Sequence, residues 1–567
     1  MTNKEIARVL KEVGALIELS GGNTFRSRAY LNAARTVDQM ELQIGTLPPD
    51  VEVLDVPGIG KGIFAQIREL LCTGTFDLRE ELLGSLPPGV VELLSIRGLG
   101  AKRIRRLWQE LGVDSVEKLE EAALTGRIAT LGGFGPKSEE QILKAVQFYR
   151  SSHSYRHIDV AFALVAPLVE QLRALPGVDR VEVAGEMRRR LEIVQRADVV
   201  VSTSDRKATE VALPASFVKV EHPEADAVYD GKLEGGFPAR LVMTSPERFG
   251  YTLWRTTGSE AHCEKFFTRY GPPAETGEEA DLYTGIGLSY VPPELREDRG
   301  EIEEAAAGTL PALIETFDLK GCLHNHTTYS DGAHTLREMA EAARAMGYSY
   351  FAVCDHSRSL SIANGLSIER LREQQAEIAD LNRQFAADRA KPFRIFSGIE
   401  SDILADGSLD YPEDVLDSLD LVVASVHTGL KMDREEATER VLRAVNNPYT
   451  TILGHATGRL LLQREGYPLD FERIFDACTR NGVAIEVNAN PRRLDLDWRW
   501  IRMATDRGVL ISINPDAHST SQLHLVEWGV GVARKGRLTP AQCLNALPLE
   551  AFEAWLAARR KSRNEAR

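Results

Sequence analysis

Cysteine is scarce in this sequence, with six residues in a chain of 567 and no CxxC pair among them. That scatter argues against a disulfide framework and is typical of a protein from a reducing cytosol. Long apolar runs are also missing: no stretch approaches the roughly 20 residues that cross a bilayer. The opening MTNKEIARVLKEVG lacks the apolar core of a signal peptide. We therefore expect a cytoplasmic protein.

Global disorder is excluded by the composition, in which 43% of residues are hydrophobic and 27% are charged. At roughly 100–200 residues per domain, the length predicts about three to five domains. Positive charge is in deficit, because the net charge is −15 at pH 7, which is unusual for a nucleic-acid binder. Residues 102–106 and 188–190 are basic runs, and charge alone favours a solvated face for each.

A turn of the form apolar-Gly-apolar-Gly occurs three times, at residues 56–61, 96–102 and 131–137, each time before a helical period. Such glycines permit a hairpin that points backbone amides at one phosphate, and the helix N-terminus adds partial positive charge. Binding of this kind is neutral to base sequence. The turns resemble helix-hairpin-helix DNA-binding motifs, with a plain helical bundle as the alternative. The candidate DNA-binding residues are Gly58, Gly60, Lys61, Gly98, Gly100, Lys102, Arg103, Gly133, Gly135 and Lys137.

Residues 23–35 resemble the small lyase domain of family X DNA polymerases. In lyase-active members, a lysine after the first hairpin forms a Schiff base with an abasic sugar. Gln66 stands at that position here, and Gly62 replaces an accessory lysine. Because an amide cannot be the amine nucleophile, we expect no lyase chemistry and assign Lys61 to phosphate binding.

Three apolar runs in the middle of the chain predict strands, at residues 181–185, 197–201 and 240–243. Their order, followed by Thr257-Gly258-Ser259, is similar to the nucleotidyltransferase palm and thumb of family X polymerases. The resemblance implies a nucleotide-binding remnant that consists of Gly185, Arg188, Arg189, Gly258 and Ser259.

The palm departs from the family at its metal ligands. Family members hold two Mg²⁺ ions on three carboxylates. Here Asp198 is retained, whereas Arg196 and Arg240 take the other two positions. A guanidinium has no lone pair for a metal and repels a divalent ion, and Glu186 replaces a serine that would bind triphosphate. We expect a weakened or lost polymerase site, unless Glu182, Glu186 or Glu192 supplies the missing ligands.

Beyond residue 320, eight of the twelve histidines accumulate. Six apolar runs lie there, and five of them lead into a potential metal ligand; the runs cover 350–354, 393–399, 421–426, 451–454, 484–488 and 509–513. Helical periods separate several of them, for example at 365–385, 432–445 and 470–481. Alternating strands and helices with ligands at the strand ends are typical of a barrel with its site at one mouth.

His324 and His326 form an HxH pair, whose imidazoles share one face of an extended segment. Imidazole with carboxylate suits Zn²⁺, Mn²⁺ or Fe²⁺. The order of ligands is similar to that of the polymerase-and-histidinol-phosphatase (PHP) domain, a distorted barrel that binds three metals. The resemblance implies one ion on His324, His326, Glu400 and Asp516, a second on Glu400, His427 and His455, and a third on Asp331, His356 and His518. His334, His524 and Asp355 are expected to lie off the metals.

The sequence as a whole is similar to bacterial family X DNA polymerases and predicts a multidomain α/β protein. The expected parts are a lyase-like helical domain with the first hairpin (1–85), fingers with the other two hairpins (86–150), an α+β palm (151–246), a thumb (247–295), a charged linker (296–318) and a distorted (β/α) PHP barrel (319–567).

The resemblance implies a DNA-repair protein of the bacterial nucleoid with a 3′–5′ exonuclease in its PHP domain. Its cofactors would be Mn²⁺ and/or Zn²⁺, up to three ions, with Mg²⁺ or Mn²⁺ at the palm only if the polymerase is active. The expected partner is gapped or primer–template DNA, bound through its backbone, together with deoxynucleoside triphosphates if the palm works. Two alternatives stay open: a bifunctional Mn²⁺-dependent gap-filling polymerase and exonuclease in base excision repair, and a small-molecule phosphoesterase. The three hairpins argue against the second.

Overall fold

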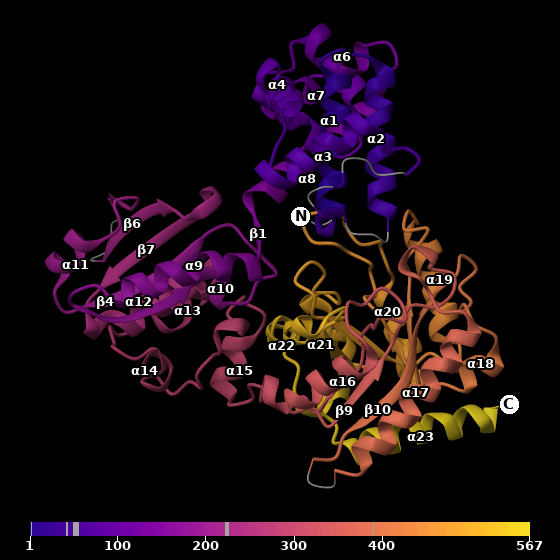
Figure 1. The fold of residues 1–567 in the computed structure, drawn as a ribbon. Helices are drawn as coiled ribbons and strands as arrows, with labels where there is room; N and C mark the ends of the chain where they lie inside the picture. The colour runs from indigo at the N-terminus through magenta and orange to yellow at the C-terminus, as the bar shows by residue number, and fades with distance from the viewer. Residues whose placement is uncertain are drawn as a thin grey trace. The chain divides into compact units, whose positions relative to one another are not determined.

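The computed structural model describes residues 1, 3–40, 44–48, 51, 56–221, 226–388 and 391–566. These residues form two compact units, Met1–Ser154 and Tyr155–Arg567 (Figure 1). Among the described helices, none is both long and apolar enough to cross a membrane.

The first unit is helical. Its α-helices are α1 (Asn3–Leu19), α2 (Thr24–Gln39), α3 (Lys61–Thr73), α4 (Asp77–Ser85), α5 (Pro88–Glu92), α6 (Ala101–Leu111), α7 (Val116–Leu124) and α8 (Pro136–Ser154), with 3-10 turns at Ile44–Thr46, Leu93–Ser95 and Ile128–Thr130. Helix α1 contributes to two apolar cores, because Leu10 and Val13 pack with α2 and α3 whereas Leu16 and Leu19 pack with α6 and α7. The predicted helices after each glycine turn are therefore present, as α3, α6 and α8.

The second unit begins with a five-stranded sheet. Its strands run in the order β2 (Val178–Ala184), β4 (Ala197–Thr203), β7 (Pro238–Thr244), β6 (Ala227–Lys232) and β5 (Val218–Val220). Only β4 and β7 are parallel neighbours, and a short ribbon pairs β1 (Arg156–His157) with β3 (Ile193–Val194). Three short helices accompany them: α10 (Gly185–Arg188), α11 (Arg206–Ala212) and the 3-10 turn Glu234–Gly236.

Helices cover both faces of this sheet, which explains why every residue of β4 is buried. Val199 and Val201 belong to the core on the side of α9 (Ile158–Arg173). Val200, between them, packs with Phe249 of α12 (Phe249–Thr257) on the other face. The alternation follows from the two-residue period of a strand and places the three predicted palm strands as β2, β4 and β7.

The thumb packs around aromatic side chains. It consists of α13 (Glu260–Tyr270), α14 (Glu279–Thr284) and α15 (Glu301–Ala307), with 3-10 turns at Pro246–Arg248, Pro293–Leu295 and Thr316–Asp318. Trp254, Phe266 and Tyr283 form its core, and Ile302 of the expected linker belongs to the same core.

Part of the expected linker at 296–318 packs within the thumb. Arg296 is completely buried, and its guanidinium donates to Glu279 at 2.5 Å and to the Val291 carbonyl at 3.0 Å. The charged run looks solvated in sequence, but its charges are compensated by partners inside the thumb.

The C-terminal part is a parallel barrel of seven strands in sequential order: β8 (Gly321–Cys322), β9 (Tyr350–Val353), β10 (Arg394–Asp402), β11 (Leu421–Ser425), β12 (Ile452–Leu453), β13 (Ala484–Asn488) and β14 (Ile511–Asn514). A bridge between Asn325 and Ala517 joins the two edges, so the barrel is nearly closed. This confirms the distorted PHP-type barrel.

Helices and short turns connect the strands and surround the barrel (Figure 1). They are α16 (Leu336–Ala345), α17 (Ile368–Ala386), α18 (Glu413–Asp417), α19 (Arg434–Val445), α20 (Phe471–Asn481), α21 (Trp498–Asp506), α22 (Val526–Lys535) and α23 (Leu549–Ala566), with 3-10 turns at Ser361–Ala363, Thr520–Leu525, Pro540–Gln542 and Leu544–Ala546. Helix α23 closes the barrel at the end where the strands begin, because Phe552 stacks on Tyr350 with ring centres 4.7 Å apart.

The palm is joined to the barrel by ion pairs and ring contacts. Glu192, which precedes β3, lies 3.3 Å from the guanidinium of Arg459, a partly buried residue in the loop after β12. Arg190 stacks over Trp528 of α22 with its guanidinium carbon 5.7 Å from the ring centre. These contacts connect the palm to the loops at the mouth of the barrel.

Candidate metal centre

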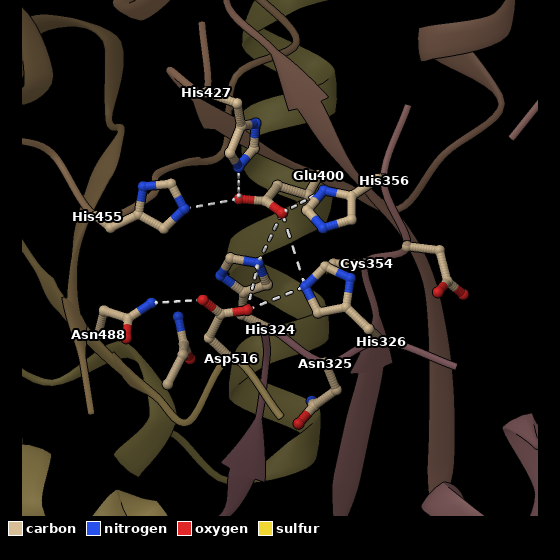
Figure 2. A network of polar contacts seen from close by, with 12 residues as sticks. His324, Asn325, His326, Cys354, His356, Glu400, His427, His455, Asn488 and Asp516 are labelled. Atoms are coloured by element: carbon tan, nitrogen blue, oxygen red, sulfur yellow. Dashed lines mark hydrogen bonds and ion pairs between the residues drawn. The ribbon is translucent and has the colours of Figure 1, made fainter. Parts of the chain in front are cut away.

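The nine predicted ligands come together at the carboxyl end of the barrel strands, and Figure 2 labels all of them except Asp331 and His518. Each follows or ends a strand, so the parallel arrangement delivers all of them to one mouth. His324, His326 and Asp331 follow β8, His356 follows β9, Glu400 lies in β10, His427 follows β11, His455 follows β12, and Asp516 and His518 follow β14.

Glu400 lies at the centre of the cluster and is buried. Its Oε1 is 2.9 Å from His455 Nε2 and 3.3 Å from His427 Nε2. Its Oε2 is 2.9 Å from His356 Nδ1, and the Nε2 atoms of His324 and His326 lie at 3.5 and 3.6 Å from the same oxygen. One carboxylate thus faces five imidazoles, an arrangement suited to bridging two cations.

Asp516 forms a second acidic position beside the HxH pair. Its Oδ1 is 3.0 Å from His326 Nε2 and 3.7 Å from His324 Nε2. Its Oδ2 accepts a hydrogen bond from Asn488 Nδ2 at 3.0 Å, which orients the carboxylate. Asp516 has a φ of 52°, and such left-handed residues are often found at functional sites.

Asp331 marks the open side of the cluster, where its side chain is 36% exposed. Its Oδ1 lies 3.4 Å from His518 Nε2, 3.7 Å from His356 Nε2 and 3.9 Å from His326 Nδ1. A substrate would therefore reach the cluster past Asp331 and His518.

Unpaired donor atoms in the interior indicate that the cluster fits metal ions. Among the described residues, five buried atoms of the cluster have no hydrogen-bond partner: His324 Nε2, His326 Nδ1, His356 Nδ1, Glu400 Oε2 and His455 Nδ1. Buried polar atoms without a partner are rare and require an explanation such as an ion. Three sets have ligand atoms within 4.8 Å of one another: His326–Asp331–His356–His518, His324–His326–Glu400 and His356–Glu400–His427.

These sets agree only in part with the ions expected from the resemblance. The third expected group is present, with His326 added to it. Asp516 and His455 fall outside the three sets, although each lies within 3.0 Å of a member.

Two buried carboxylates that the sequence did not single out orient the histidines. Glu486 accepts from His324 Nδ1 at 2.7 Å and from the His455 backbone amide at 2.7 Å. Asp402 accepts from His427 Nδ1 at 2.5 Å. A carboxylate on one ring nitrogen leaves the other free for a metal and makes it a better donor. The signal in the sequence that could have identified these two residues was an acid inside each apolar strand.

Asp355 lies off the cluster, as expected. Its carboxylate accepts from the amide and hydroxyl of Thr327 at 2.8 and 2.6 Å and from Gln374 at 2.6 Å, so it holds the loop after β8. His334 also lies aside, with its Nδ1 3.4 Å from the Thr520 amide.

The side chains of the cluster shift one another's pKa values strongly. Burial lowers the pKa of His427, but Glu400 and Asp402 outweigh burial and raise this pKa to about 10. Burial, together with the charges of His518 and His356, lowers the pKa of His326 to about 3. Burial raises the pKa of Asp331, but the hydrogen bond from His518 and the nearby histidines lower it to about 2. Ions binding here would displace protons from the imidazoles, so occupancy depends on pH.

The palm site is occupied by ion pairs. Strand pairing sets Asp198 of β4 beside Arg240 of β7. Arg196 Nε donates to Asp198 Oδ1 at 2.8 Å, and Arg240 forms a two-pronged pair with Asp230 at 2.7 and 2.8 Å. Gly185 has a φ of 61°, and a side chain there would collide with Asp198.

The expected nucleotide-binding arginines are also engaged. Arg188 binds both oxygens of Glu279 at 2.7 Å, and Arg189 binds Glu297 at 2.8 Å. Ser259 caps α13 by accepting from the His262 amide at 3.1 Å, and Gly258 precedes this cap. Of the acids that could replace lost ligands, Glu186 accepts from the Gln195 amide at 2.9 Å and Glu192 faces Arg459.

The three glycine turns of the first unit share one geometry. The first glycine of each has a positive φ of 98°, 81° and 83°, at Gly58, Gly98 and Gly133 respectively. The second glycine precedes the helix, and a Cβ added to it would meet nothing within 4 Å, as found at Gly60, Gly100 and Gly135. The basic side chains beside the turns are exposed: Lys61, Lys102, Arg103 and Lys137. Backbone amides at these helix starts are therefore accessible to a phosphate.

Gln66 lies on α3 and accepts a hydrogen bond from the hydroxyl of Tyr30. This contact gives the amide a structural partner at the position where a lyase would carry its lysine.

Comparisons with known proteins match all parts of the chain. Family models describe residues 1–76 as a helix-hairpin-helix domain, 90–147 as a SAM-like helix-hairpin-helix tandem and 323–490 as a PHP domain. The "DNA polymerase/3′-5′ exonuclease PolX" of Bacillus subtilis is 36% identical over 98% of this chain and 99% of its own length. Probable phosphatases from Thermoanaerobacter sp. and Acetivibrio thermocellus are 27% and 33% identical over 39% and 29% of this chain, and over 88% and 63% of their own lengths.

Proposed function

The chain belongs to the family X DNA polymerases that carry a C-terminal PHP domain, and from this membership we propose that its intact activity is a metal-dependent 3′–5′ exonuclease in the barrel. The observation that carries the proposal is the cluster of nine ligands with unpaired donor atoms around Glu400. We assign it to DNA repair in the bacterial cytoplasm, at the nucleoid.

The residues suit up to three ions, with Mn²⁺ or Zn²⁺ favoured by the mixture of imidazole and carboxylate. The proposed ligands are His324, His326, Asp331, His356, Glu400, His427, His455, Asp516 and His518. When bound, such ions supply a water of lowered pKa and stabilise the leaving oxygen of a phosphodiester.

The protein's own side chains contribute orientation and access. Glu486 and Asp402 fix the tautomers of His324 and His427, so that Nε2 of each faces Glu400. Asp331 and His518 border the exposed side, where a strand end would enter. The remainder of the cluster is buried apart from the partly buried His427, which keeps the ligands in place.

DNA binding is the function of the helix-hairpin-helix modules in the first unit. We propose that the three exposed glycine turns grip the backbone of gapped or primer–template DNA, with Lys61, Lys102, Arg103 and Lys137 adding charge. We propose the domain limits expected from the sequence, except that residues 296–307 belong to the thumb.

For the palm we propose a weakened or lost polymerase. Arg196 and Arg240 occupy two carboxylate positions, and the surviving Asp198 is already paired. Arg188 and Arg189 hold carboxylates instead of a triphosphate. The second candidate, a bifunctional Mn²⁺-dependent polymerase and exonuclease, is favoured by the name of the Bacillus relative. A small-molecule phosphoesterase agrees with the probable phosphatases, but these match only the barrel part of the chain.

The test is a primer–template assay with Mn²⁺, with and without nucleotides. We expect shortening of the primer in both conditions, and no shortening by His427→Ala. Asp198→Ala is the matched control, because it removes the palm carboxylate and should leave shortening unchanged. Shortening by His427→Ala at the wild-type rate would refute the barrel as the nuclease, and brisk extension that Asp198→Ala abolishes would favour the bifunctional candidate.

A further inference from the structure

A second concavity lies at the end of the barrel opposite the metal centre. It has a volume of about 620 Å³ and is bounded by α23 and by residues at or just before the starts of β10, β11 and β12. Figure 1 shows α23 along the end of the barrel where β9 and β10 begin. None of the nine candidate ligands lines it, so the proposed nuclease makes no use of it. We refer to this concavity as the base pocket.

The floor of the base pocket is apolar. Phe396 and Leu421 come from the strand starts, Leu416 and Leu419 from the segment before β11, and Leu556 from α23. The first four are almost completely buried, so the floor is a formed part of the fold. A floor of this kind accepts an aliphatic or aromatic side chain of a partner.

The rim carries an excess of positive charge. Arg394, Arg559, Arg560, Lys561 and Arg563 line the pocket, against the three acids Asp420, Glu553 and Glu565. The acids are already engaged: Glu553 binds Arg394, Glu565 lies 3.8 Å from Lys561, and Asp420 accepts from the Ser397 amide at 3.0 Å. In a chain with a net charge of −15, a cationic concavity is a local exception.

Two of these arginines lack a carboxylate partner among the described residues. Arg559 donates only to backbone carbonyls, at 2.7 Å to Asn481, at 2.5 Å to Thr450 and also to Gly482. Arg560 is exposed and donates to the Leu419 carbonyl at 3.1 Å. Burial, together with the charge of Arg563, lowers the pKa of Arg559 to about 10. A largely buried cation without a counter-charge is unfavourable, and an anionic ligand would relieve it.

We propose that the base pocket is a docking site for a short acidic peptide segment of another protein, with one apolar side chain inserted on the floor. Carboxylates of the segment would pair with Arg559 and Arg560, as arginine clusters do in the recognition of acidic motifs. The apolar side chain would contact Phe396 and Leu556.

The pocket favours a peptide over nucleic acid for two reasons. A sugar–phosphate backbone has no apolar side chain to place on the floor, whereas a peptide can carry one beside its carboxylates. A binding face for DNA is, moreover, already provided by the glycine turns of the first unit.

The experiment measures binding of the full chain to a labelled peptide of several aspartates that ends in phenylalanine, by fluorescence anisotropy. We expect binding that weakens with salt, and a loss of about tenfold or more in affinity for Arg560→Glu, because a like charge at a rim opposes an acidic partner. Leu556→Trp should weaken binding by filling the floor. The matched control is Arg372→Glu, which changes the net charge equally at an exposed position of α17 outside the pocket and should bind like wild type.

Three outcomes would overturn the proposal. Equal affinity of wild type and Arg560→Glu for the peptide would show that the peptide does not bind in the base pocket. Equal affinity for a peptide that ends in alanine would reduce the site to a general anion site. Displacement of the peptide by duplex DNA in a Lys102→Glu/Arg103→Glu background would identify the occupant as nucleic acid. Nuclease activity should be equal in wild type, Arg560→Glu and Arg372→Glu, so failure of this proposal is distinguishable from failure of the proposed nuclease.

Discussion

Arg196 Nε donates to Asp198 Oδ1 at 2.8 Å, so this carboxylate of the palm is held by a guanidinium two residues before it in the chain. Burial raises the pKa of Asp198, while Arg196 and then Arg240 act to lower it. The two arginines thus provide the palm with fixed positive charge where the family has metal ions.

Reversal of these replacements should restore synthesis. Arg196→Asp with Arg240→Asp would rebuild three carboxylates on β4 and β7, and positioned metals supply most of the catalysis in phosphoryl transfer. We expect primer extension to rise by roughly one order of magnitude or more over wild type with Mn²⁺. Arg180→Asp, at an exposed position of β2, is the control for added acid. No gain in the double variant would place the defect at Glu186 or at the engaged Arg188 and Arg189.

Glu486→Gln should weaken metal binding without removing a ligand. The amide keeps the shape of the side chain but no longer accepts strongly from His324 Nδ1, and loss of such a partner reduces metal affinity by about 10–100-fold. Titration of nuclease activity with Mn²⁺ would show a higher half-saturating concentration and a similar maximal rate. Asp402→Asn should act in the same direction through His427. Unchanged Mn²⁺ affinity in both variants would contradict the orienting role.

The salt dependence of DNA binding should show whether the hairpins bind the DNA backbone. Lys102→Glu with Arg103→Glu changes two exposed cations beside the second turn, and removal of one cation that binds a phosphate flattens the log–log slope by about 0.9 on duplex DNA. Lys144→Glu is the control, since this lysine is 72% exposed and lies in the middle of α8, beyond the last turn. The measurement is affinity for a gapped duplex across a salt series. The same slope in wild type and double variant would exclude the second hairpin from backbone binding.

The thumb should lose stability in acid through Glu279. Burial raises its pKa, but Arg296 and Arg188 outweigh this and lower the pKa to about 2 from an ordinary 4.5. The carboxylate therefore stabilises the thumb fully above pH 4.5, by about 3 kcal/mol. This contribution is lost as the pH falls from 4.5 towards 2.

Glu279→Gln would remove that contribution and leave the buried Arg296 without its charge partner. Urea unfolding followed by tryptophan fluorescence should show a free energy of unfolding for the variant that is well below that of wild type at pH 7 and much closer to it near pH 2. Glu278→Gln, an exposed neighbour, is the control. The same loss of unfolding free energy at both pH values would refute the charge of Glu279 as the source of this stability.

The strands of the barrel and the clustering of the candidate ligands were predictable, because parallel strands deliver their carboxyl ends to one mouth. Glu486 and Asp402 were not singled out, because an acid within an apolar run has no local mark of its partner. The pairs Arg188–Glu279 and Arg189–Glu297 join residues 91 and 108 positions apart. For that reason the basic run 188–190 did not reveal that its charges were already compensated. The burial of Arg296 within the expected linker was hidden for the same reason, since Arg296 meets Glu279 only in the fold.

The pair between Glu192 and Arg459 gives the palm a role that is independent of its chemistry. Arg459 is partly buried, four residues after His455, and also binds Asp497 at 2.8 Å, so the palm forms one wall of the loop that carries this histidine. Deletion of the palm would remove one of the two carboxylates that pair with Arg459 and would uncover Trp528. The palm therefore also acts as a buttress for the barrel, whether or not it catalyses synthesis.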